Sequence, residues 1–225
     1  MTSKIKSNFK NKKGFTLAEV LITLVIVGVI AAMTIPTLIN KYKDEELKSQ
    51  FRKAYSTITQ AIYKTEMNDF YGYARCYTHG ELGQNVEECG AFFDALAKNL
   101  HVQKVCRGNA KADGCVPTYT HTIQEACEGL TVNTIENRSR VYVLNDGQLI
   151  ITYSDYCFAH FMVDINGQKG PNLLGIDLFQ FTMQRDRNTG IYTNKATKCY
   201  WNPQAGYGKG RTTQQMIQYA FGGKK

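Results

Sequence analysis

A single acidic residue, Glu19, lies near the start of an otherwise apolar stretch of the chain. Residues 20–35 contain no charged side chain, and this composition predicts a helix that can enter hydrocarbon. A carboxylate at the centre of such a helix costs about 2.5–3.5 kcal/mol on insertion scales, so Glu19 should have a polar partner. Glu19 is therefore the first candidate for a functional side chain.

The residues before this stretch have the composition of a processing signal. Five lysines and no acidic residue precede Gly14 and Phe15. A basic leader beside an apolar segment is typical of a signal that is removed, and it orients the N-terminus toward the cytoplasm. The chain carries a net charge of +8, and the five leader lysines account for all but +3 of it. Overall basicity therefore says little about partners.

The segment 12–33 resembles the prepilin family, the class III signal of type IV pilins and type II secretion pseudopilins. The resemblance implies that prepilin peptidase cleaves between Gly14 and Phe15, that Phe15 is N-methylated and that Glu19 is the fifth residue of the mature chain. In the family, this carboxylate pairs with the terminal amine of a neighbouring subunit in a filament. The alternatives are a secretory signal peptide cut near Ala32 and a plain signal-anchor helix.

The predicted helix continues well beyond the apolar segment. Residues 15–39 span about 37 Å as a helix, enough to cross a hydrocarbon core of about 30 Å, and are predicted to be its transmembrane and assembly half. Apolar side chains recur at spacings of three and four over 40–69, which predicts an amphipathic half packed on a globular head. Pro36 should kink the helix and, by the resemblance, act in assembly, because proline removes one internal hydrogen bond.

Residues 70–225 are predicted to form the head. Asp146-Gly147 is a strong hairpin signal, because this pair accepts the positive φ angles of a tight turn. Four strands within 141–183 are predicted, at residues 141–144, 148–153, 158–165 and 176–183. A Cys-bearing insert, 70–134, contains a short helix at 87–100, and 184–225 is a basic C-terminal region. The expected fold is α+β, a pilin-like lollipop with its long N-terminal helix on a four-stranded antiparallel sheet.

The chain has seven cysteines, five of them in the insert. Disulfides persist in a domain that faces outward from the cytoplasmic membrane. Cys106 and Cys115 close a loop rich in Gly, Asn and Asp and are the best pair. Further pairs are Cys76–Cys89 and Cys157–Cys199. An odd count leaves at least one thiol free or paired between chains. The alternative is a zinc site built from Cys106, Cys115, His121 and Cys127, although their spacings lack the close pairs of structural zinc sites.

The segment 163–177 is a loop rich in glycine and asparagine between two predicted strands. It resembles a segment of many pilin-like proteins, and in major pseudopilins a loop of the head binds calcium. Asp164, Asn166 and Asp177 offer the hard oxygen ligands that calcium takes. The two acids are 13 residues apart and no glutamate occupies the twelfth position, unlike in an EF-hand. The alternative is a loop held by Asx turns.

The resemblance implies a structural subunit of a type II secretion pseudopilus or a type IV pilus. Its partners would be prepilin peptidase, other pilin or pseudopilin subunits, an inner-membrane assembly platform and, before assembly, membrane lipid. The expected location is the bacterial cytoplasmic membrane, single-pass with the head outward, and then the filament. No local pattern of an enzyme is present, and calcium at the 163–177 loop is the one cofactor that the sequence suggests besides the alternative zinc site. The alternative function is DNA capture through Lys209, Arg211 and Trp201, which combine charge with stacking surface.

Overall fold

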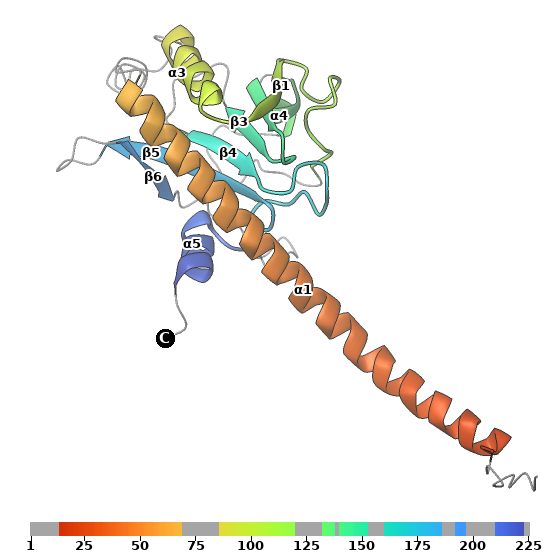
Figure 1. Ribbon diagram of the computed structural model, residues 1–225. Helices are drawn as coiled ribbons and strands as arrows, with labels where there is room; N and C mark the ends of the chain where they lie inside the picture. Colours follow the sequence, from red (N-terminus) through yellow and green to blue (C-terminus); the bar gives the residue numbers. More distant parts are fainter. Residues whose placement is uncertain are drawn as a thin grey trace, which may run out of the picture. The chain divides into compact units, whose positions relative to one another are not determined.

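The computed structural model describes residues 14–68, 86–119, 132–137, 140–152, 160–185, 192–196 and 210–222. Its elements are α1 (Leu17–Asn68), α3 (Val86–Lys98), β1 (Val102–Arg107), α4 (Val132–Asn137), β2 (Arg140–Leu144), β3 (Leu149–Thr152), β4 (His160–Asp164), β5 (Leu178–Arg185), β6 (Tyr192–Ala196) and α5 (Thr213–Phe221), shown in Figure 1. The chain divides into two compact units between Asp44 and Glu45. Helix α1 contributes residues to both units.

The first unit contains the apolar part of α1. The helix begins at Leu17 and continues through Pro36 without interruption, which confirms the predicted long N-terminal helix. A window of α1 with a mean hydropathy of 2.5 is long and apolar enough, by length and composition, to cross a membrane. The hydroxyls of Thr23 and Thr34 donate to backbone carbonyls of their own helix, so neither requires a partner in hydrocarbon. A kink at Pro36 stays a prediction.

The second unit contains an antiparallel sheet whose strands neighbour one another in chain order, from β1 to β6. The predicted α+β class is confirmed, and β2 to β5 match the four predicted strands. The predicted number of strands, four, was too low, because the described residues form six. Strand β1 lies at one edge of the sheet. Three consecutive residues of this strand are exposed. An edge strand of this kind lacks the apolar alternation by which strands are found in a sequence.

Successive side chains of a strand point to opposite faces of the sheet. Both faces are covered by other elements, so the sheet is the middle of three layers. All four residues of β3 are buried, and Ile150 packs with α1 whereas Leu149 and Ile151 pack on the other side. On the first face lie α1, α3 and α5 (Figure 1). On the second face lie α4 and residues 110–119, which follow β1. Burying each large apolar side chain contributes roughly 1.5–3 kcal/mol, so both layers stabilise the head.

Helix α1 packs on the sheet through the amphipathic pattern predicted for its second half. Phe51 and Ile58 are fully buried, and the Phe51 ring lies 4.9 Å from that of Phe179, edge to face. Lys53, on the exposed side of α1, pairs with Asp146 of the β2–β3 turn at 2.9 Å. This packing places the predicted hairpin beside the helix.

The basic C-terminal region contributes α5, a helix that was not predicted. Thr212 caps it in a reciprocal capping box with Gln215, and Met216 and Ala220 are buried in the core. The Arg52 guanidinium donates to the carbonyl of Ala220 at the end of α5, where cations are favoured by the helix dipole. Helix α5 therefore contacts the second half of α1, although the two are far apart in the sequence.

Candidate functional site

The start of α1 holds the residues that sequence patterns indicated first. Glu19 Oε2 accepts hydrogen bonds from the backbone N–H and the hydroxyl of Thr16, both at 2.8 Å, and the Glu19 N–H donates to Thr16 Oγ1 at 3.2 Å. This reciprocal arrangement is a capping box, which satisfies donors that every helix N-terminus leaves unpaired. Glu19 therefore has a partner within its own chain. Thr16 was missed, although the T-x-x-E spacing was a sufficient signal.

Gly14 and Phe15 are not held by the fold. A Cβ at Gly14 would meet no atom within 4 Å, so packing does not require a glycine at this position. The Phe15 side chain is 89% exposed. The pattern of a glycine before an exposed apolar residue therefore needs an explanation outside the folded chain, such as recognition of the segment by another protein.

The first half of α1 exposes a continuous apolar surface. Its large side chains between Leu17 and Ile39 are exposed by 43% or more. Apolar surface of this extent marks a contact with a membrane or with a partner. Glu19 is the only charged residue between positions 15 and 40. Glu19 therefore places a single carboxylate near the N-terminus of a helix whose exposed surface is otherwise apolar.

The structure pairs Cys106 with Cys115 in a disulfide, as predicted, with their Cα atoms 6.4 Å apart. Both are buried, and in this state their sulfurs are not zinc ligands. Cys76, Cys157, Cys199, His121 and Cys127 lie outside the described residues, and so does the side chain of Cys89. The other predicted pairs therefore stay predictions.

The loop predicted to bind calcium is ordered by hydrogen bonds to its two acids. Asp164 Oδ1 accepts from the backbone N–H of Asn166 at 3.2 Å and of Gly167 at 2.7 Å. Asp164 Oδ2 accepts from the Tyr119 hydroxyl at 2.9 Å. These contacts are the Asx-turn arrangement that was the alternative to a metal site. They also connect the loop to a tyrosine 45 residues away.

Asp177 closes the other end of this loop. Its two oxygens accept from the backbone N–H groups of Asn172 at 2.7 Å and Leu173 at 2.6 Å. Burial, and then the charge of Asp177, raise the pKa of Asp164 to about 8, against the opposing effect of its hydrogen-bond donors. Burial also raises the pKa of Asp177. The charge of Asp177 thus disfavours the ionised form of Asp164.

Three observations bear on whether calcium fits this loop. Each of the four carboxylate oxygens of Asp164 and Asp177 already accepts a hydrogen bond, so a cation would have to displace or share these donors. Asn166 Oδ1 is buried and without a hydrogen-bond partner in the described part of the chain. No group of three or more His, Cys, Asp or Glu side chains within that part could hold a metal ion. Calcium binding therefore stays a prediction.

Of the residues predicted to contact DNA, the structure describes Arg211. Its guanidinium lies 4.0 Å from the centre of the Tyr219 ring, and the Lys48 ammonium lies 4.5 Å from the same ring. Cation–π contacts of this kind are worth roughly 0.5–1 kcal/mol at exposed sites, so both cations help to hold α5. Lys209 and Trp201 lie outside the described residues.

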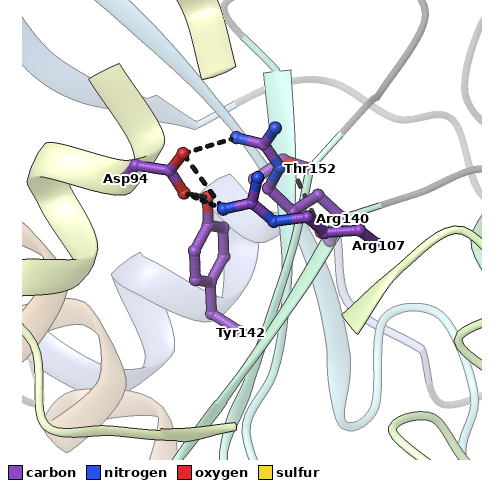
Figure 2. Close-up of polar contacts among 5 residues, drawn as sticks. All are labelled: Asp94, Arg107, Arg140, Tyr142 and Thr152. Carbon is purple, nitrogen blue, oxygen red and sulfur yellow. Dashed lines mark hydrogen bonds and ion pairs between the residues drawn. The ribbon is translucent and has the colours of Figure 1, made fainter. Parts of the chain in front are cut away.

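Figure 2 shows a polar cluster that sequence reasoning missed. The Asp94 carboxylate of α3 lies 3.2 Å from a guanidinium nitrogen of both Arg107 and Arg140, and it accepts a hydrogen bond from the Tyr142 hydroxyl at 2.9 Å. Thr152 donates to the backbone carbonyl of Arg140 at 3.2 Å. The cluster ties α3 to β1 and β2 and has no feature of a catalytic site, so we assign it a structural role.

Residues 9–35 match the family model of the prokaryotic N-terminal methylation motif, which is the signal of type IV pilins and pseudopilins. The match ends within α1 and does not include the head. No curated protein and no solved structure matches the chain. The N-terminal segment is therefore identified by its motif, whereas the head is known through its structure alone.

Proposed function

We propose that this chain is a prepilin-like subunit that polymerises into a type II secretion pseudopilus or a type IV pilus. Prepilin peptidase would cleave it between Gly14 and Phe15 and methylate the new terminus. The methylation motif at residues 9–35 carries the proposal. Two features of the structure support it: residues 14–16 are exposed, and the apolar half of α1 has no partner surface among the described residues.

The exposed helix explains why a membrane and a filament are alternative environments for this chain. Before assembly, residues 15–39 would lie in the cytoplasmic membrane, with the head outward and the lysine-rich leader inside. In a filament, apolar helices of neighbouring subunits would pack side by side and replace the contacts with lipid. The role is structural, and an inner-membrane platform would drive the exchange.

Glu19 would fix the register between subunits. In the structure its Oε2 is held by Thr16. Cleavage would create an amine on Phe15 of a neighbouring subunit, and the Glu19 carboxylate would pair with it. A buried ion pair of this kind contributes more to specificity than to stability. Thr16 would keep the carboxylate in place until that partner arrives.

Mass spectrometry of the intact chain and its N-terminal peptide, isolated from the native membrane, tests the proposal. We expect a mature form that begins with N-methylated Phe15. Gly14→Val is the matched variant, because the fold has space for its side chain and only processing should be lost. A chain that still begins at Met1 in the presence of active peptidase, or one cut near Ala32, would contradict the proposal.

Which filament the subunit enters is tested by deleting the gene and restoring it. Loss of sheared surface filaments would indicate a pilus, and loss of secreted proteins without loss of surface filaments would indicate a pseudopilus. DNA capture is the alternative role of the head. It predicts salt-dependent DNA binding that weakens in the double variant Lys209→Gln, Arg211→Gln. Absence of binding at low salt would remove that alternative.

A further inference from the structure

The loop between β4 and β5 is held from both ends by buried acids. Asp164 and Asp177 are each 0% exposed. Together they accept hydrogen bonds from four backbone N–H groups of the loop and from the Tyr119 hydroxyl. Hydrogen bonds from several donors offset part of the cost of burying an acid without a counter-cation. The loop therefore contains the donors that its own acids require.

The same loop contacts three other segments of the head. Tyr119 belongs to the loop that follows the Cys106–Cys115 disulfide, and the Gln168 amide donates to the carbonyl of Gly114 within that disulfide loop at 3.3 Å. Gly167 passes so close to the β2–β3 turn that a Cβ would lie 1.9 Å from the Gly147 carbonyl oxygen. Its φ of +64° also favours glycine.

The third contact is to the chain that leads into α5. The Arg211 N–H donates to the carbonyl of Gly175 at 2.7 Å, and a Cβ at Gly175 would lie 2.7 Å from the Arg211 carbonyl oxygen. Two residues later, the Thr213 hydroxyl donates to the carbonyl of Gln180 in β5 at 2.7 Å. The loop thus lies at the meeting point of the disulfide loop, the hairpin turn and the C-terminal segment.

We propose that residues 164–177 form a cation-independent latch, closed by Asp164 and Asp177, which fastens the disulfide loop and the C-terminal segment to the sheet. This inference goes beyond the filament function and does not depend on it. The donors that surround the two acids occupy the positions that a cation would need. The latch predicts that the order of these segments depends on Tyr119 and on the two carboxylates, and is insensitive to calcium.

Hydrogen exchange, followed by mass spectrometry of the full chain in detergent micelles, tests the latch. Peptides covering 106–119 and 164–177 are compared in EGTA and in about 1 mM calcium, the range in which extracellular modules bind this ion. We expect equal protection in both. Tyr119→Phe removes only the hydroxyl, and we expect exchange in both peptides to rise about tenfold, as for the loss of one buried hydrogen bond. Tyr63→Phe, on the exposed face of α1, is the matched control and should change neither.

A second variant addresses the other end of the latch. Asp177→Asn replaces one acceptor oxygen by an NH₂ group that faces a backbone N–H, so the loop peptide should exchange faster while the peptide of α3 is unchanged. Two results would overturn the inference. One is protection of the loop that appears only with calcium and disappears in Asp177→Asn, which would establish a cation site. The other is unprotected exchange of the loop in both buffers.

Discussion

Arg107 of β1 and Arg140 of β2 lie directly opposite each other in the sheet. Like charges in this position destabilise a strand pair. Asp94 lies 3.2 Å from a nitrogen of each guanidinium and compensates this repulsion (Figure 2). Because Asp94 belongs to α3, the compensation also attaches that helix to the edge of the sheet.

Removing the bridging carboxylate should expose the repulsion between the two arginines. We expect Asp94→Ala to lower the free energy of unfolding by about 1 kcal/mol, a modest value because the cluster is partly exposed to solvent. Arg107→Gln should restore part of the loss in the double variant. Denaturant unfolding measures both effects. Asp113→Ala, at an exposed position, is the control, and an equal loss there would contradict the explanation.

The packing of α1 on the sheet should depend on its buried face alone. Phe51→Ala removes a fully buried ring, and we expect a loss of about 3–5 kcal/mol in the free energy of unfolding of the head. Tyr63→Ala on the exposed face of the same helix should stay within about 0.5 kcal/mol. Calorimetry of the two variants checks the contrast. Similar losses in both would mean that α1 is not packed on the sheet through Phe51.

Stability of the head should fall as the pH rises from about 4 to about 8. The pKa of Asp164 is raised to about 8 in the folded chain, whereas an unfolded aspartate titrates near 3.9. The folded state therefore holds a proton that the unfolded state loses, so the stabilisation is complete below the unfolded pKa and is lost as the pH rises through the folded one. Asp164→Asn should flatten this dependence in thermal unfolding, whereas Asp113→Asn should preserve it. An unchanged slope in Asp164→Asn would contradict the assignment.

The Cys106–Cys115 disulfide should stabilise the layer on the α4 side of the sheet. In the chain-entropy model, a crosslink that closes a loop of this length contributes about 2–3 kcal/mol. We expect the double variant Cys106→Ser, Cys115→Ser to lose about this amount in urea unfolding. Reducing agent should also lower the free energy of unfolding of the wild-type protein. Full stability of the variant would show that the buried loop is held by its other contacts.

The two roles of Glu19 can be separated. Glu19→Gln keeps an acceptor for the Thr16 N–H and should preserve the first turn of α1, but it lacks the charge that a neighbouring amine would need. Thr16→Ala keeps the charge and loses the capping hydroxyl, at a cost of about 1 kcal/mol of helix stability. We expect filament yield to fall strongly in Glu19→Gln, and amide exchange at Leu17–Val20 to rise in Thr16→Ala. Wild-type filament yield in Glu19→Gln would rule out the charge pair.

Patterns within short windows of the sequence determined much of this protein. The length and apolarity of residues 15–39 predicted the first half of α1, and the spacing of Phe51 and Ile58 predicted its second half. Asp146-Gly147 predicted the hairpin between β2 and β3. The residues that form each of these features are neighbours in the chain. Periodicity and turn residues within a short window are therefore enough to predict them. The methylation motif is of the same kind, because it lies in one continuous segment, residues 9–35.

The tertiary structure alone decided what depends on residues far apart in the chain. Edge strand β1 forms because β2 supplies a partner, although its own side chains are largely exposed. The roles of Asp94, beside two arginines, and of Asp164, beside Tyr119, follow from contacts across 13 to 48 positions. No local pattern reports such contacts, because the energy of a buried charge depends on which donors the fold brings to it.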